Sequence, residues 1–189
     1  ELEGQDAIFG IPADLFFRPE ENDPFRLHVY GTTLETPVGV AAGPHTQMAQ
    51  NIIVAWLCGG RFIELKTIQT LDELDINKPC IDIQDEGYNV EWSQALRVEE
   101  SLREYVAGMM LVEMFRHTHP MASPLCAKTP GEVIYDISLG YDLEGIKSDK
   151  IQRYLDGLRD ASPMIEKLRR EIPEKFQAAR DLDYPACLS

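Results

Sequence analysis

Two short apolar runs, separated by an amphipathic segment, dominate the hydrophobic pattern of the chain. The first run, Val38 to Ala42, stops at Gly43-Pro44, and the second, Phe62 to Leu65, ends on Lys66-Thr67. A strand, a helix and a strand in this order form a parallel pair whose carboxyl ends meet at one rim. We therefore predict that Gly43 and Lys66 lie side by side there, with the Lys66 ammonium pointing into the mouth of a barrel.

The segment between the two runs, Thr46 to Cys58, contains no Asp, Glu, Lys or Arg. A helix on a protein surface normally carries a charged face, so something must cover this one. Another part of this chain and a partner domain are both possible covers.

The pattern predicts five further elements. These are a β-hairpin from Phe25 to Glu35, a long packing helix from Ser93 to Arg116, a third strand from Glu132 to Leu139, a helix capped by Ser148 that runs to about Asp160, and a helix from Pro163 to about Arg180. The predicted fold class is α/β: a partial (β/α)8 TIM-type barrel, with its first three βα units preceded by the hairpin. We divide the chain into an N-terminal docking segment and hairpin, 1–36, and the first part of the barrel, 37–189.

A complete barrel needs ~250 residues, whereas this chain has 189. Three parallel strands would leave two open edges, and the apolar Leu15-Phe16-Phe17 and the uncharged helix would add exposed hydrophobic surface. We therefore expect a longer polypeptide in which the chain continues beyond Ser189 into a fourth strand. A homo-oligomer that completes the sheet between copies is the rival explanation.

Charge and cysteine content exclude several classes of function. The net charge of −14 and the pI near 4.6 argue against nucleic acid as a partner, because neutralising phosphates takes clustered Lys and Arg. The four cysteines are widely spaced and form no CxxC pair, which fits reduced thiols in the cytoplasm. No signal peptide and no apolar run of ~18 residues is visible, so we expect a cytoplasmic protein without a membrane span.

No metal or phosphate motif is expected. The acidic residues between Ile68 and Trp92 lack calcium-loop spacing, and His117 and His119 form no complete metal site. Neither form of Gly-rich phosphate loop is present. Asp136 stands among apolar residues, so we expect a buried carboxylate that is either paired inside the barrel mouth or functional.

Several motifs carry a family resemblance that covers about Ile8 to Leu158. TPVGVAAGP followed by ELKT resembles the first two βα units of the FMN barrel shared by dihydroorotate and dihydropyrimidine dehydrogenases. AAGPHTQMAQNI, GGRFIELKT, KPCIDIQDEGYNVEWS and LGYDLEGIK more closely resemble the N-terminal barrel region of bacterial flavin and iron–sulfur oxidoreductases named selenate reductases. Nothing in these residues supports selenate itself as the electron acceptor.

The resemblance implies FMN at this barrel, and FAD, NAD(P) and 4Fe-4S centres elsewhere in the full-length family. It places Ala41, Ala42 and Gly43 close to the isoalloxazine ring, Lys66 at its electron-accepting edge and Thr67 as a hydroxyl partner. Asn89 would contact substrate, and His45 would have a flavin-side or substrate role. Asn89 could instead be a turn residue, and His45 a helix-capping residue beside Thr46.

The resemblance assigns no catalytic residue, since the proton-donating base of such barrels follows strand four and the phosphate grip lies on strands seven and eight. The expected function is electron transfer as part of a multi-domain oxidoreductase, and this stretch alone should be inactive. The partners would be the remaining domains of a longer polypeptide or redox subunits. A flavin-free, barrel-derived structural or docking domain of a larger redox complex is the alternative.

Overall fold

The structure is a computed structural model that describes residues 7–20, 22–70, 81–82, 88–89, 96–118, 132–140 and 142–188. The elements before the long central helix are β1 (Ala7–Ile8), β2 (Ile11–Pro12), η1 (Ala13–Leu15), β3 (Leu27–Val29), β4 (Thr32–Leu34), β5 (Gly39–Val40), η2 (Pro44–Thr46), α2 (Ala49–Leu57), β6 (Phe62–Gln69), β7 (Ile81–Asp82) and β8 (Tyr88–Asn89). That helix and the elements after it are α3 (Val98–Thr118), β9 (Ile134–Gly140), α5 (Leu143–Ile146), α6 (Asp149–Arg159), α7 (Ser162–Glu171), η3 (Glu174–Phe176) and α8 (Gln177–Arg180).

The three predicted strands form one parallel sheet in the order β5-β6-β9. Gly39 pairs with Phe62 on one side of β6, and Phe62 pairs with Ile134 on the other. The predicted hairpin is also present, with Leu27 of β3 opposite Leu34 of β4 in an antiparallel pair. Across the described residues the parallel sheet has three strands and does not close into a barrel. The three parallel strands and the α/β class are therefore confirmed, and the barrel arrangement stays a prediction.

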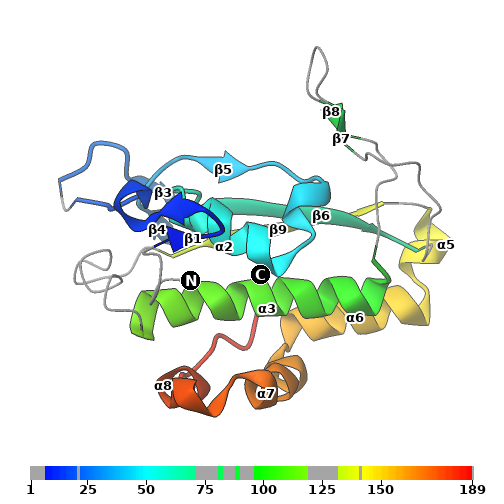
Figure 1. Ribbon diagram of the computed structural model, residues 1–189. Helices are drawn as coiled ribbons and strands as arrows, with labels where there is room; N and C mark the ends of the chain where they lie inside the picture. The colour runs from blue at the N-terminus through cyan, green and yellow to red at the C-terminus, as the bar shows by residue number, and fades with distance from the viewer. Residues whose placement is uncertain are drawn as a thin grey trace.

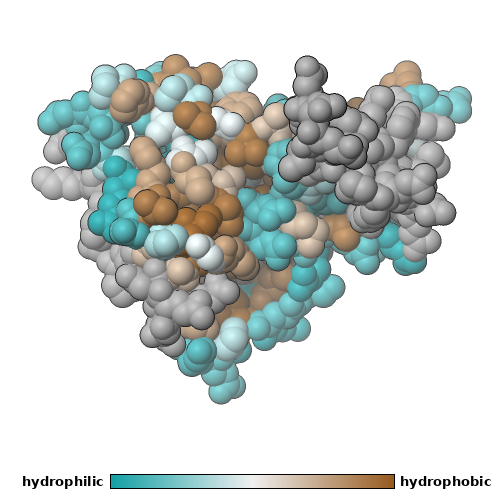
Figure 2. Space-filling model, turned by 45° about the horizontal axis from the view of Figure 1, so that its top comes forward, coloured by the Kyte–Doolittle hydropathy of each residue, from teal (hydrophilic) through white to brown (hydrophobic). Residues whose placement is uncertain are grey.

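Helices cover one face of this sheet. In Figure 1, α3 and α6 lie beneath the strands, and α2 lies between α3 and β5. Alternate residues of β6 follow this arrangement, because Ile63 and Leu65 are buried in the helix layer whereas Phe62 and Glu64 are half-buried. Figure 2, with the upper side of Figure 1 turned forward, shows hydrophobic and hydrophilic residues side by side on the outer surface. The face opposite the helices, called the open sheet face below, is the side that would line a barrel.

The uncharged helix α2 is covered by this chain itself. Its residues Ile52 and Ile53 are almost fully buried, and α3 packs along it closely enough that a Cβ on Gly108 would lie 2.7 Å from the Ile52 Cδ1 atom. Phe16 is buried in a hydrophobic cluster with Ile53 and Trp56 of α2, and the Phe17 N–H donates to the Leu57 carbonyl. The expectation that α2 and Phe16 leave hydrophobic surface exposed is therefore wrong, although Leu15 is 68% exposed.

A side chain from α3 also caps α2. The residue preceding the helix, Met48, offers no side-chain cap, and the Ala49 N–H donates instead to Glu104 Oε2 at 2.9 Å. Amide groups in the first turn of a helix lack partners within it, and a carboxylate there also complements the helix dipole. The sequence pattern of α2 alone gives no sign of this cap.

The C-terminal helices differ from the prediction in one place. Ser148 caps α6 through the Ile151 N–H, and α6 ends at Arg159, as expected. The helix predicted from Pro163 to Arg180 is instead divided, since α7 ends at Glu171 and Ile172 is extended. Pro173 explains the break, because proline disfavours helical geometry in the residue before it and has no N–H to donate.

Two further expectations change. Asp136 is exposed on β9 rather than buried, because it alternates with Tyr135 and Ile137 and so lies on the open sheet face. Strand β6 does not end at Lys66-Thr67 but continues to Gln69 through an irregularity in its pairing.

The long helix begins at Val98, and the part predicted from 93 to 95 lies outside the described residues. None of the described helices is long and apolar enough to cross a membrane.

Candidate cofactor site at the carboxyl ends of the strands

The end of β5 presents small residues and an accessible backbone. Ala41 is exposed, Ala42 is half-buried and Gly43 is buried in extended conformation before η2. The Thr46 hydroxyl lies 3.1 Å from both the N–H and the carbonyl oxygen of Gly43, which holds this turn. His45 directs its Nε2 atom to the Ala41 carbonyl oxygen at 3.0 Å. The capping interaction thus belongs to Thr46, and His45 contacts the backbone of the strand end.

Glu64 of β6 reaches the same strand end. Its Oε2 atom accepts a hydrogen bond of 3.0 Å from the Ala42 N–H, and its register partner on β9 is Asp136. Residues paired in register share a face of the sheet, so two carboxylates lie on the open sheet face. Glu64 is not among the predicted site residues, although its place between the apolar Ile63 and Leu65 indicates a side chain on the opposite face of the strand.

Lys66 and Thr67 lie in an irregularity of β6. Pairing with β9 runs through Leu65 opposite Ile137 and resumes with Ile68 opposite Leu139. Lys66 is 4% exposed, and its Nζ atom lies 3.4 Å from the Thr67 carbonyl oxygen. Continuing the register of Val40 with Ile63 along both strands brings Gly43 level with Lys66. Their meeting at one rim, and the direction of the ammonium into a barrel mouth, stay predictions.

The backbone of Asn89 lies in β8, where it pairs with Ile81. Its side chain lies outside the described part of the chain, as does most of the acidic segment after β6. No group of three metal-ligating side chains occurs among the residues that the structure describes.

The strand ends offer a flavin ring steric room and one nearby cation, but also a carboxylate. Neither Ala41 nor Ala42 extends beyond Cβ, so a flat ring could approach the backbone there, and Lys66 is a cation on the neighbouring strand. Glu64 limits which ring could bind there, because its carboxylate already accepts a hydrogen bond from the Ala42 N–H. A ring with negative charge would need that carboxylate to move or to be neutralised.

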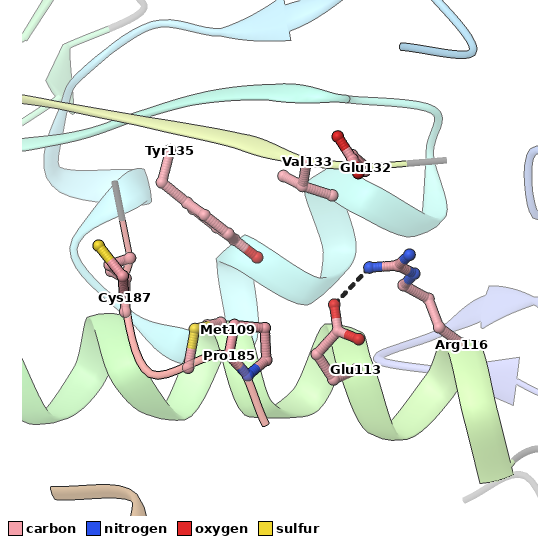
Figure 3. Close-up of a pocket in the computed structure, with 9 residues that line it drawn as sticks. Met109, Glu113, Arg116, Glu132, Val133, Tyr135, Pro185 and Cys187 are labelled. Atoms are coloured by element: carbon pink, nitrogen blue, oxygen red, sulfur yellow. Dashed lines mark hydrogen bonds and ion pairs between the residues drawn. The ribbon is translucent and has the colours of Figure 1, made fainter. Parts of the chain in front are cut away.

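A hollow that was not predicted lies at the opposite ends of the strands, between α3, the start of β9 and the C-terminal segment. It has a volume of about 360 Å³ and is lined by Met109, Glu113, Arg116, Glu132, Val133, Tyr135, Pro185, Cys187 and Leu188. Figure 3 shows the Glu113–Arg116 ion pair on α3 below the Tyr135 ring, which descends from β9. Burial, assisted by the Glu113 charge, raises the Tyr135 pKa. Because Glu132 and Val133 precede β9, this hollow is separate from the strand ends described above.

Comparisons with known proteins identify relatives along almost the whole chain. Residues 9–186 match the family described as "Oxidoreductase YgfK, N-terminal TIM-barrel domain". Two proteins named "Putative oxidoreductase YgfK", from Escherichia coli K12 and Escherichia coli O157:H7, are each 44% identical over 162 residues. The alignment covers 86% of this chain and 15% of each relative.

Proposed function

Because this chain belongs to the family of N-terminal TIM-barrel domains of the oxidoreductase YgfK, we propose that its strand ends hold FMN in a multi-domain oxidoreductase. In this proposal β5, β6 and β9 are the first three strands of the barrel, and the open sheet face is part of its interior. The rest of the barrel belongs to the longer polypeptide, since the chain spans 15% of the length of its relatives.

The observation that carries the proposal is the combination of small residues at the end of β5 with a buried lysine on β6. Exposed Ala41 and half-buried Ala42 would lie under the ring, and Gly43 would keep the turn close to it. Lys66 would place positive charge near the ring, and Thr67 would offer a hydroxyl group. His45, bonded to the Ala41 carbonyl, and Asn89 on β8 are assigned to the substrate side.

Bound FMN would supply the redox chemistry, and the protein would supply binding, orientation and charge. Iron–sulfur centres, FAD and NAD(P) are assigned to other domains of the polypeptide or to partner subunits, so this chain alone would not turn over. We place the protein in the cytoplasm, in keeping with the free thiol of Cys58.

A flavin-free docking domain is the second candidate, and Glu64 favours it. The Glu64 carboxylate accepts a hydrogen bond from the Ala42 N–H, and Asp136 is paired in register with Glu64 on the neighbouring strand. Negative charge at the point where the ring would lie opposes a ring that becomes anionic on reduction. On this view the open sheet face serves only to bind the rest of the polypeptide.

Purification of the full-length protein under native conditions decides between the two. The proposed function requires that the purified protein contain FMN. The flavin is identified by chromatography after acid release, so that FAD from another domain is not mistaken for FMN. Ala42→Leu and Lys66→Met should each lower the FMN content, whereas Leu143→Met, at an exposed position on α5, should not. FAD without FMN in the wild-type protein would favour the flavin-free candidate.

A further inference from the structure

The irregularity in β6 is a β-bulge at the proposed cofactor site. Lys66 and Thr67 together stand opposite the single residue Ser138, because the register moves from Leu65–Ile137 to Ile68–Leu139. A bulge disrupts the hydrogen-bonded ladder and redirects the side chains of its residues. The direction of Lys66 therefore depends on how this bulge is held.

A tyrosine from the helix layer holds it. Tyr105 of α3 is fully buried, and its hydroxyl donates a hydrogen bond of 2.7 Å to the Lys66 carbonyl oxygen. In a regular strand that carbonyl would point towards a neighbouring strand, whereas here it accepts from a helix packed on the sheet. Burial raises the Tyr105 pKa, while the Ser101 hydroxyl nearby acts in the opposite direction, and the phenol remains a donor at neutral pH.

The next carbonyl of the bulge contacts the lysine ammonium. Lys66 Nζ lies 3.4 Å from the Thr67 oxygen, so two successive carbonyl groups of the bulge are each bonded by a side chain. Loss of the Tyr105 bond would free the Lys66 carbonyl to turn back towards the ladder. The Thr67 carbonyl and the ammonium it contacts would then move as well.

We propose that Tyr105 is a positioning residue: its hydroxyl fixes the bulge at Lys66 and Thr67 and thereby sets where the Lys66 ammonium lies at the strand ends. The consequence for a flavin rests on the proposed function and deepens it. The positioning of the lysine itself does not depend on a cofactor. Tyr105 lies in the core with no exposure to solvent, so it would act through Lys66.

Tyr105→Phe in the full-length protein tests the flavin side, because it removes the hydroxyl and keeps the ring. Tyr154→Phe is the matched control: Tyr154 is 2% exposed, and its hydroxyl has no hydrogen-bond partner within the described part of the chain. Tyr105→Phe should weaken FMN binding about three- to ten-fold, the effect of losing one hydrogen bond, and shift the flavin reduction potential. Tyr154→Phe should leave both at the wild-type value.

Chemical labelling of the same proteins tests the positioning without a cofactor. Acetic anhydride should modify buried Lys66 slowly and exposed Lys167 rapidly, as read by mass spectrometry of peptides. Tyr105→Phe should accelerate labelling at Lys66 about three- to ten-fold relative to Lys167, and Tyr154→Phe should not.

Equal Lys66 labelling in wild type and Tyr105→Phe would overturn the inference. Faster labelling in a protein without FMN would support the inference while the proposed function fails. Faster labelling with unchanged FMN affinity and potential would overturn the link to the cofactor, because the lysine would then have moved without effect.

Discussion

Arg61 joins the N-terminal hairpin to the start of β6. It is 2% exposed, and its Nε atom lies 2.6 Å from Glu35 Oε2. Its Nη1 atom donates to the carbonyls of Trp56 and Gly60, and the guanidinium lies over the rings of Phe17 and Trp56. A buried charge is tolerated when it is paired and bonded in this way, but the remaining charge is costly when one partner is removed.

We therefore expect Arg61→Met to lower the free energy of unfolding by about 3–5 kcal/mol, because the buried Glu35 carboxylate would lose the positive charge that balances it. The control is Arg159→Met, since Arg159 forms an exposed pair with Asp156 and such pairs contribute about 0–1 kcal/mol. Urea denaturation of the purified chain measures both. Equal losses for the two variants would show that the Arg61–Glu35 pair does not hold the hairpin.

At the scale of elements, the packing of α2 on α3 depends on a missing side chain. A Cβ on Gly108 would lie 2.7 Å from Ile52 Cδ1 and 3.0 Å from Ile52 Cβ. Ile52 is fully buried, and its branched Cβ is fixed to the backbone of α2. Gly157 of α6 is similarly close to Leu102, but there the nearest atom, at 2.5 Å, is the end of a half-buried side chain.

Overpacking at Gly108→Ala should cost about 1–3 kcal/mol, against the ~1 kcal/mol that alanine usually gains over glycine inside a helix, so the net destabilisation should reach about 2 kcal/mol. Gly157→Ala should cost less, because Leu102 can change rotamer. Thermal unfolding monitored by circular dichroism compares the two. A Gly108→Ala variant as stable as wild type would mean that the helices separate at little cost.

At the scale of the whole molecule, buried phenol groups couple folding to alkaline pH. Burial raises the pKa of Tyr184 to about 12, and it raises the pKa values of Tyr105, Tyr135 and Tyr154 as well. A raised pKa in the folded state means that the unfolded chain loses its protons first. The stability from these groups is complete below about pH 10 and falls as the pH rises above it.

We expect the free energy of unfolding to fall above pH 10 by up to about 1.4 kcal/mol per pH unit for each buried tyrosine. Tyr184→Phe should make the decline between about pH 10 and 12 shallower. Tyr30→Phe serves as control, because Tyr30 is 83% exposed. Urea midpoints measured from pH 8 to 11 give the slopes, and an identical slope in wild type and Tyr184→Phe would contradict the assignment.

The sequence by itself determined the order and type of the main elements. Apolar runs of strand length, separated by a helix-length segment, indicate parallel β5, β6 and β9 because these patterns depend on neighbours along the chain. The hairpin and the Ser148 cap were predictable for the same reason. The division after Glu171 is also a local effect, because Pro173 disfavours helical geometry in the residue before it.

Only the tertiary structure decided which residues meet across the fold. The cap that Glu104 gives to α2, the Glu64 contact with the Ala42 N–H and the Tyr105 bond to Lys66 join residues between 22 and 55 positions apart. Asp136 was expected to be buried from its apolar neighbours, but the alternation of a strand places it on the face without helices. Contacts of this kind depend on how elements pack together, which the spacing of residues along one element does not encode.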